Sequence, residues 1–272
     1  MFVPLELDVT GKLKTGENEL RLDFDSAPRI ARERRSAFLA EEGMPDDVSR
    51  FDERAFVRKA QYMFAWDWGP RLTSAGIWRD VALLEYQARL TDVHVTQKHL
   101  PGGDVELSFA SQVDGKGQVY HWVEGAPIAD GQSVRLSQPE LWWPGGLGAQ
   151  KLYRVDSFLL PPGAPPPQAR PEAALDTRSQ RIGLRTLRLL READAQGESF
   201  EFVVNGARLW AVGANWIPDH TFPSIVDRAR LRTQIGRALD MNMNMLRIWG
   251  GGGTKDDAGA YRYDRAGAGV DG

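Results

Sequence analysis

Alternating apolar and polar positions open the chain and predict β structure. Residues Phe2 to Val9 alternate, and Leu20 to Phe24 alternate again after a stretch rich in turn residues, as half-buried antiparallel strands do. A second β block is predicted over the aromatic-rich residues 56–68, before a turn at Gly69-Pro70, and again over Gly76 to Leu84. The first third of the chain is therefore predicted to be mainly β.

The segment between these two blocks has a different pattern. Residues 27–54 are rich in arginine and in acidic residues and contain few apolar ones. The arginines could form an anion-binding patch, but the interleaved acids favour a solvated surface helix or loop.

From about residue 87 the pattern is one of short apolar runs separated by turn residues, as in a small antiparallel sandwich. The predicted strands are Leu90–Thr96, Asp104–Phe109, Gln118–Val123, Ser133–Leu136 and Lys151–Leu160. Residues 161–167, PPGAPPP, predict a stiff hairpin tip or linker. In the alternative interpretation, residues 161–167 are a ligand for a proline-recognition domain.

After about residue 187 the pattern changes to mixed α and β. An Asn-Gly turn at 205–206 inside an apolar stretch predicts a β-hairpin over 200–212. Leu231, Ile235 and Leu239 share one helical face and predict an amphipathic helix over 226–241, followed by a short strand at 245–249. Strand, helix and strand make one βαβ unit. A complete (β/α)₈ barrel takes about 250 residues, so this unit would be only part of one.

Length and composition narrow the class of protein. A chain of 272 residues predicts two or three domains, and 42% hydrophobic with 26% charged residues is ordinary globular composition. A net charge of -3 gives no reason to expect nucleic acid or a membrane as partner. No apolar run is long enough to span a membrane and no export signal is visible, which favours the cytoplasm. The absence of cysteine excludes disulfides and a thiol nucleophile.

Several kinds of site are excluded by motif. No G-x-S-x-G, H-E-x-x-H, phosphate-loop or EF-hand string occurs. The four histidines, His94, His99, His121 and His220, lack metal-ligand spacing. We therefore predict no metal and no cofactor. Nine tryptophans are unusual. Tryptophans at this density often simply form core, but sugar rings stack on indoles, so a carbohydrate site is a candidate as well.

The strongest candidate is Trp66-Asp67-Trp68. At strand periodicity the two indoles share one face and Asp67 lies on the other, where its carboxylate could accept hydrogen bonds from sugar hydroxyls. In the alternative interpretation the tryptophans are sandwich core and Asp67 is a solvated strand-end residue or a turn cap.

A second candidate is the pair Arg247 and Trp249, at the end of the strand 245–249. In (β/α) folds the carboxyl ends of the strands face the active site. Asn215 and Trp216 end the preceding strand in the equivalent position. Alternatively, Trp249 is interior packing and Arg247 forms a structural ion pair.

Six sequence blocks occur in the order found in glycoside hydrolase family 2, which the chain resembles. They are Gly76-Ile77-Trp78-Arg79, Leu141-Trp142-Trp143-Pro144-Gly145-Gly146, Arg181-Ile182-Gly183-Leu184-Arg185-Thr186, Asn205-Gly206, Gly213-Ala214-Asn215-Trp216 and Asn242 to Gly252. Within that family the stretch Arg58 to Pro70 and the Arg-x-Trp-Gly-Gly-Gly run most resemble the β-mannosidases.

The resemblance implies a multidomain, mainly β protein. Expected are the C-terminal part of a jelly-roll sugar-binding domain over 1–86, an immunoglobulin-like sandwich over 87–187, and an incomplete N-terminal part of a (β/α)₈ TIM barrel over 188–272. We expect truncation at both ends relative to the family and a C-terminal tail, 259–272, that departs from the family pattern.

The implied activity is retaining hydrolysis of terminal β-D-mannose residues, with an oligosaccharide or β-mannoside as substrate. The family's two catalytic glutamates lie on later barrel strands, so no catalytic residue is expected in this chain and the chain alone is expected to be inactive. The residues expected to bind substrate are Trp66, Asp67, Trp68, Arg247 and Trp249. The alternatives are another family 2 exo-glycosidase, acting on a glucosaminide, galactoside or glucuronide, and a carbohydrate-binding β-sandwich without turnover.

Overall fold

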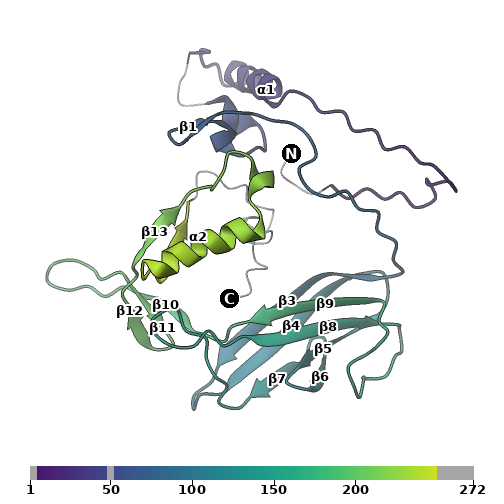
Figure 1. Ribbon diagram of the computed structural model, residues 1–272, viewed down its shortest axis with the longest axis vertical. Coiled ribbons are helices and arrows are strands. Elements are labelled where there is room, and N and C mark those ends of the chain that lie inside the picture. The colour runs from purple at the N-terminus through teal and green to yellow at the C-terminus, as the bar shows by residue number, and fades with distance from the viewer. Residues whose placement is uncertain (1–4, 48–51, 250–272) are drawn as a thin grey trace. The chain divides into compact units, whose positions relative to one another are not determined.

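A computed structural model describes residues 5–47 and 52–249 of the chain. These residues divide into two compact units. One contains residues 5–47, 52–81, 214–236 and 246–249, and the other contains residues 82–213 and 237–245. Most of the regular structure is β, with few helices (Figure 1). The prediction of a mainly β protein is confirmed.

The second unit contains an antiparallel β-sandwich. One sheet has the strand order β3-β4-β7 and the other β6-β5-β8-β9. The strands are β3 (Arg89–His99), β4 (Val105–Asp114), β5 (Gln118–Val123), β6 (Ala126–Ala129), β7 (Ser133–Leu136), β8 (Tyr153–Leu160) and β9 (Asp176–Ile182). All five strands predicted for this region are present, and β6 and β9 were not predicted. The proline-rich residues 161–167 lie between the paired strands β8 and β9, at a hairpin tip as predicted.

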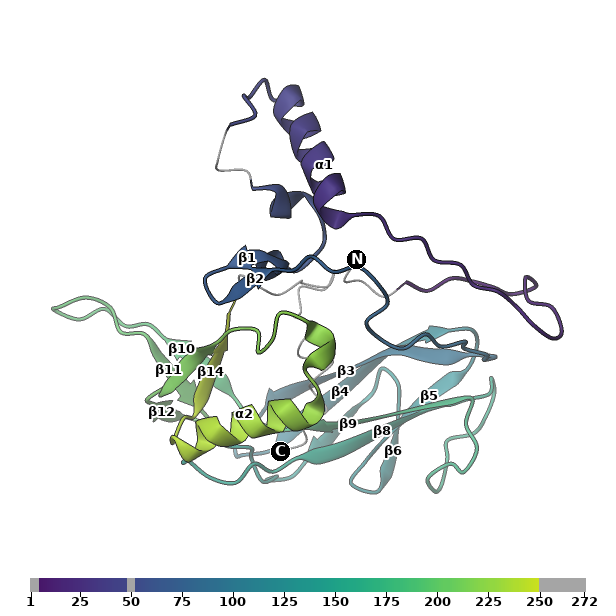
Figure 2. The same ribbon diagram turned by 45° about the horizontal axis from the view of Figure 1, so that its top comes forward.

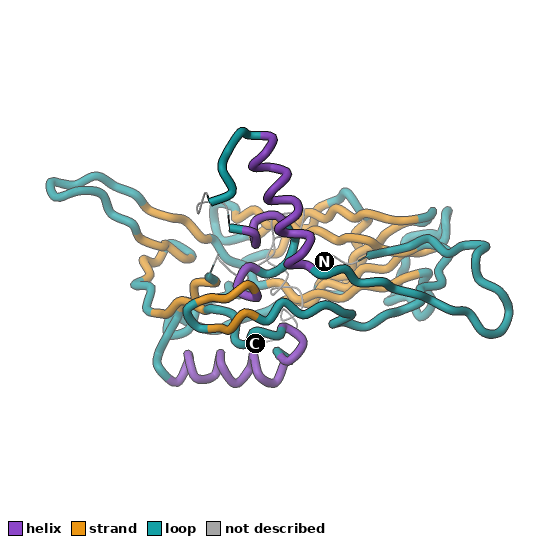
Figure 3. The backbone as a smooth tube through the Cα atoms, turned by 90° about the horizontal axis from the view of Figure 1, so that it is seen from above, coloured by secondary structure: helices purple, strands orange, loops and turns teal. Residues whose placement is uncertain are grey.

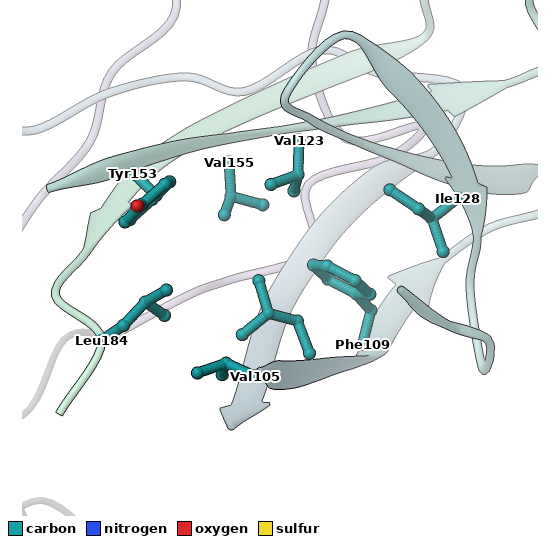
Figure 4. Packing of buried hydrophobic residues seen from close by; sticks show 8 residues of the cluster. Val105, Phe109, Val123, Ile128, Tyr153, Val155 and Leu184 are labelled. Carbon is teal, nitrogen blue, oxygen red and sulfur yellow. The ribbon is translucent and has the colours of Figure 1, made fainter. Parts of the chain in front are cut away.

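The core of the sandwich comes from the inward-facing residues of both sheets (Figure 4). Val105, Leu107 and Phe109 alternate along β4, and Val155 faces them from β8, all of them fully or almost fully buried. Burial of alternate residues from two sheets is the arrangement that makes a sandwich stable.

A buried histidine lies in the same core. His121 on β5 is 0% exposed, and its ring stacks on Phe109 with centroids 4.6 Å apart. Its Nδ1 lies 2.9 Å from the Ser157 hydroxyl and its Nε2 lies 3.0 Å from the Asp130 carboxylate. Burial lowers the pKa of His121, against the opposing effect of Asp130. We interpret this histidine, serine and aspartate as a structural group, because His121 and Ser157 are 0% and 1% exposed and only Asp130 reaches solvent.

A small sheet follows the sandwich. It has the order β10-β11-β12, formed by β10 (Leu187–Leu190), β11 (Glu201–Val204) and β12 (Ala207–Leu209). Asn205 and Gly206 both have positive φ, 49° and 84°, which is the conformation of the turn expected from Asn-Gly. The predicted hairpin is confirmed.

The predicted βαβ unit is present. It consists of β13 (Gly213–Trp216), η3 (Pro223–Ile225), α2 (Arg228–Asp240) and β14 (Met245–Ile248). Hydrogen bonds run from Met245 N to Val212 O and from Trp249 N to Trp216 O. Both partners advance in the same direction, so β13 and β14 are parallel. The spacing is so close that a Cβ on Gly213 would lie 1.8 Å from the Met245 carbonyl oxygen.

The first unit has less sheet than the sequence predicted. It contains α1 (Ala27–Glu41), η1 (Glu53–Phe56), η2 (Gln61–Met63), β1 (Phe64–Trp66) and β2 (Gly69–Arg71). The charged segment 27–54 starts with the helix α1 (Figure 2). A helix was one of the two structures predicted there, the other being a loop.

The strands predicted over the first residues, over 20–24 and over 76–84 are not formed in the described part of the chain. Residues 5–26 and 72–88 contain neither helix nor strand, and the N-terminal stretch is drawn as loop up to α1 (Figure 3). Leu5, Phe24 and Leu83 are 66%, 54% and 68% exposed. Alternation defines the two faces of a strand, but a strand also needs a hydrogen-bonded neighbour, and no described residue provides one. Residues 2–4 and the predicted C-terminal tail lie outside the described residues.

Candidate functional site

The Trp66-Asp67-Trp68 motif forms the tip of a tight hairpin. Strand β1 pairs antiparallel with β2, with Phe64 opposite Arg71 and Trp66 opposite Gly69. Asp67 and Trp68 are therefore the two turn residues. The prediction of a turn at Gly69-Pro70 is wrong, because these residues begin β2. Gly69 is buried, and a Cβ there would lie 3.4 Å from the Thr221 hydroxyl oxygen.

The two indoles converge on a third. Trp66 and Trp249 have ring centroids 5.1 Å apart and cross at 70°, and Trp68 and Trp249 are 6.4 Å apart at 79°. Edge-to-face packing of this kind is favourable beyond the area that it buries. Tyr62, fully buried on η2, packs against Trp68 at 5.1 Å. All three tryptophans are half-buried, so each keeps some surface for a ligand while it packs against its neighbours.

Asp67 differs from its neighbours. Its side chain is exposed at the hairpin tip, and no side chain in residues 5–47 or 52–249 pairs with its carboxylate. The turn therefore presents the Asp67 carboxylate to solvent beside the packed indoles. A carboxylate can accept two or more hydrogen bonds. Sugars offer the complementary surface, with hydroxyl donors next to an apolar ring face.

Arg247 and Trp249 lie in different environments. Trp249 belongs to the aromatic cluster, whereas Arg247 is exposed on β14 and donates from Nη1 to the Asn215 Oδ1 on β13, 3.0 Å away. Within the described part of the chain Arg247 forms no ion pair, so the structural ion pair considered as its alternative role is not observed. The hydrogen bond fixes one edge of the guanidinium and leaves its other donors exposed.

The structure thus joins Trp66, Trp68 and Trp249 in one cluster and places Asp67 at its hairpin. Among the described residues, no hydrogen bond or ion pair joins Arg247 to Asp67. Sequence reasoning missed Tyr62 as part of the cluster. It also missed Arg54, whose guanidinium carbon lies 4.6 Å from the centre of the Trp66 ring. The only signal for Arg54 was its place in a mixed-charge segment, which favours a solvated surface.

Lys59 supports the hairpin from its base. Its ammonium donates to the carbonyl oxygen of Ser74, just beyond β2, and burial lowers the pKa of Lys59. This hydrogen bond links the segment that enters the hairpin to the segment that leaves it.

No group of three or more metal-ligating side chains occurs within residues 5–47 and 52–249. Among the helices in the same residues, none is long and apolar enough to cross a membrane.

Comparison with known proteins identifies a matching family profile and similar proteins. A family profile described as "Glycosyl hydrolase 2 galactose-binding domain-like" matches residues 1–79. The β-mannosidase B of Aspergillus oryzae is 33% identical over 290 residues, which cover 98% of this chain and 33% of that protein. The β-mannosidase B of Aspergillus terreus is 35% identical over 287 residues, covering 98% and 32%.

This chain resembles glycoside hydrolase family 2 in its first 79 residues and β-mannosidases over 98% of its length. Among solved structures, the β-D-mannosidase of Dictyoglomus thermophilum matches with a TM-score of 0.63 and 30% identity over 85% of this chain and 30% of that one. The chain spans about a third of the length of the β-mannosidase B relatives that it matches. The resemblance identified from the sequence is therefore confirmed at the level of the family and of similarity to β-mannosidases.

Proposed function

We propose that this chain is the sugar-recognition part of a β-mannosidase, which removes terminal, non-reducing β-D-mannose residues with retention. The observation that carries the proposal is the hairpin tip, where the exposed Asp67 carboxylate stands beside the half-buried indoles of Trp66 and Trp68, both packed on Trp249. Similarity to β-mannosidases over nearly the whole chain supports the choice of sugar.

In this proposal Asp67 accepts hydrogen bonds from hydroxyls of the terminal sugar, and the exposed part of the aromatic cluster packs against its apolar face. The free donors of Arg247 bind further sugar oxygens. A charged acceptor strengthens such hydrogen bonds to about twice the strength of a neutral pair.

In this proposal the residues that cleave the glycosidic bond are not in this chain. Retaining hydrolysis needs two carboxyl groups about 5–5.5 Å apart, one as nucleophile and one as acid/base. We assign neither role to an acid of this chain. The proposed organisation is a jelly-roll portion over 1–86, an immunoglobulin-like sandwich over 87–187, and barrel sequence over 188–272.

A chimera tests the proposal. This chain replaces the matching third of the Aspergillus oryzae β-mannosidase B, and the product is assayed with p-nitrophenyl glycosides of β-mannose, β-glucosamine, β-galactose and β-glucuronic acid. The proposal predicts hydrolysis of the mannoside in preference to the other three, and no turnover by the 272-residue chain alone. Preference for another sugar would identify a different family 2 specificity. A folded chimera that binds mannosides without hydrolysing any of the four would favour a non-catalytic binding module.

A further inference from the structure

The carboxylate of Glu53 lies between two arginines from different elements. Glu53 begins the short helix η1, and its side chain is only 14% exposed. It accepts a hydrogen bond from Arg71 on β2 and another from Arg32 on α1, the latter with an N–O distance of 3.4 Å. A mostly buried carboxylate between two guanidinium groups is held more firmly than a surface ion pair.

The pairing with Arg71 fixes one strand of the candidate sugar-binding hairpin. Arg71 lies opposite Phe64 in the β1–β2 register, and its guanidinium also lies 5.8 Å from the Phe64 ring centre. Glu53 and Arg71 are separated by 18 residues. The contact therefore connects η1 to β2 across the fold of this unit rather than along the chain.

The next residue of η1 fixes the other strand. Arg54 lies over the Trp66 ring on β1 at 4.6 Å, and a cation placed over an indole within about 6 Å is attracted to it. Asp52 holds Arg54 in place, since its carboxylate lies 3.4 Å from the Arg54 Nε and accepts from the Arg54 backbone N–H at 3.1 Å. Two consecutive residues of η1 therefore contact the two strands on either side of Asp67.

Helix α1 supports η1 from behind. Besides the Arg32 contact, the rings of Phe38 and Phe56 pack 5.5 Å apart, and Arg34 donates to the Phe56 carbonyl at 3.3 Å. Figure 2 shows α1, η1 and the hairpin together in this unit. The charged segment is therefore more than a solvated surface element, because it ends in contacts that hold the hairpin.

We propose that Glu53 is a positioning residue for Asp67, acting through Arg71 and with its neighbour Arg54 to fix the hairpin tip. This inference rests on the proposed role of Asp67 in sugar binding. Glu53 touches neither sugar nor reacting atoms in this proposal, and its effect reaches the sugar only through the place of the Asp67 carboxylate.

The first test is kinetic and uses the chimera described above. Glu53→Gln keeps the shape and an acceptor oxygen but removes the charge, and we expect kcat/KM on the β-mannoside to fall about 10-fold. The matched control is Glu33→Gln on α1, which removes an exposed partner of Arg29 2.7 Å away, and should change kcat/KM less than 2-fold.

A double-mutant cycle separates positioning from a general structural role. If Glu53 acts through Asp67, adding Glu53→Gln to Asp67→Asn lowers kcat/KM less than 2-fold further. Losses that multiply would show that Glu53 acts independently of Asp67 and would overturn the inference.

The second test does not need activity. In the 272-residue chain, Glu53→Gln should raise the acrylamide-quenchable fraction of tryptophan fluorescence, and the increase should vanish in a Trp66→Phe background. Arg32→Gln, at an arginine that is 60% exposed, should give a smaller change in the same direction without threatening the fold.

The kinetic and fluorescence tests distinguish failure of the positioning role from failure of the proposed function. Quenching that is unchanged in both Glu53→Gln and Arg32→Gln would overturn the positioning role whatever the chimera does. A chimera that hydrolyses no mannoside, together with the expected quenching, would contradict the proposed function and leave the hairpin contact intact.

Discussion

Acidification is predicted to destabilise the sandwich through His121. The ring is fully buried, and in its neutral form it satisfies both nitrogens, with one bond to Ser157 and one to Asp130. Burial lowers the pKa of His121 in the folded chain below its ordinary value of 6.5. The unfolded chain therefore binds a proton first as the pH falls. The stabilisation is fully present above pH 6.5 and is lost as the pH falls from 6.5 toward the folded pKa.

The size of the effect can be tested with His121→Leu. The substitution removes the hydrogen bond to Asp130, about 1 kcal/mol, and leaves the buried Ser157 hydroxyl without its partner, at about 1–3 kcal/mol. The Asp130 carboxylate, 32% exposed, can turn to water. We expect a loss of about 2–4 kcal/mol at pH 8, together with loss of the pH dependence between pH 8 and 5.5.

The assay unfolds the chain in urea at each pH. A short pulse of hydrogen exchange at one common pH then labels the unfolded fraction, and mass spectrometry measures the label in peptides covering β5 and β8. These peptides report the sandwich alone. His94→Gln, at an exposed position of β3, is the matched control and should retain the pH dependence. His121 does not carry the pH dependence if His121→Leu keeps the same pH dependence as the unsubstituted chain, or if the sandwich gains stability on acidification.

Two further pairs of substitutions, each a test with its control, examine the packing. Gly213→Ala should separate β13 from β14 and lower stability by about 3 kcal/mol, because the new Cβ meets the Met245 carbonyl at 1.8 Å. Gly236→Ala in α2, where nothing lies within 4 Å, should be neutral or stabilising by up to about 1 kcal/mol, and equal effects in thermal melts would contradict the close strand approach. Leu107→Ala, at a fully buried core position, should cost about 2–5 kcal/mol in urea unfolding, whereas Leu187→Ala, 63% exposed, should cost less than about 0.5 kcal/mol. A similar cost at both leucines would be inconsistent with the core described here.

The parts of the fold that sequence predicted well are those specified by neighbouring residues. The limits of β5 and β7 agree with the predicted runs, and the Asn205-Gly206 turn and the helix α2 were found from local signals. Each depends on a turn preference or on a periodicity that is complete within about fifteen residues.

The parts that were missed depend on partners distant in sequence. The alternating residues before α1 have the pattern of a strand but no paired neighbour in the described residues. The turn at Asp67 was displaced by two residues, because Gly-Pro is a strong turn signal and only the pairing of Trp66 with Gly69 overrides it. The contact between Glu53 and Arg71 gives no local signal at all. The motif at 66–68 could be chosen from the sequence, but the elements that hold it could not.

The central claim is that Asp67 binds the terminal sugar, and Asp67→Asn in the chimera tests it most directly. Asparagine keeps the shape and replaces a charged acceptor, and a charged hydrogen bond contributes about 1.5–3 kcal/mol, so kcat/KM on p-nitrophenyl β-mannoside should fall about 10- to 150-fold. The melting temperature should stay within about 2 °C, because Asp67 is exposed. Asp80→Asn, at another exposed position of the same unit, should leave both quantities unchanged. An Asp67→Asn chimera with undiminished kcat/KM would contradict the claim and leave the hairpin tip as a solvated turn.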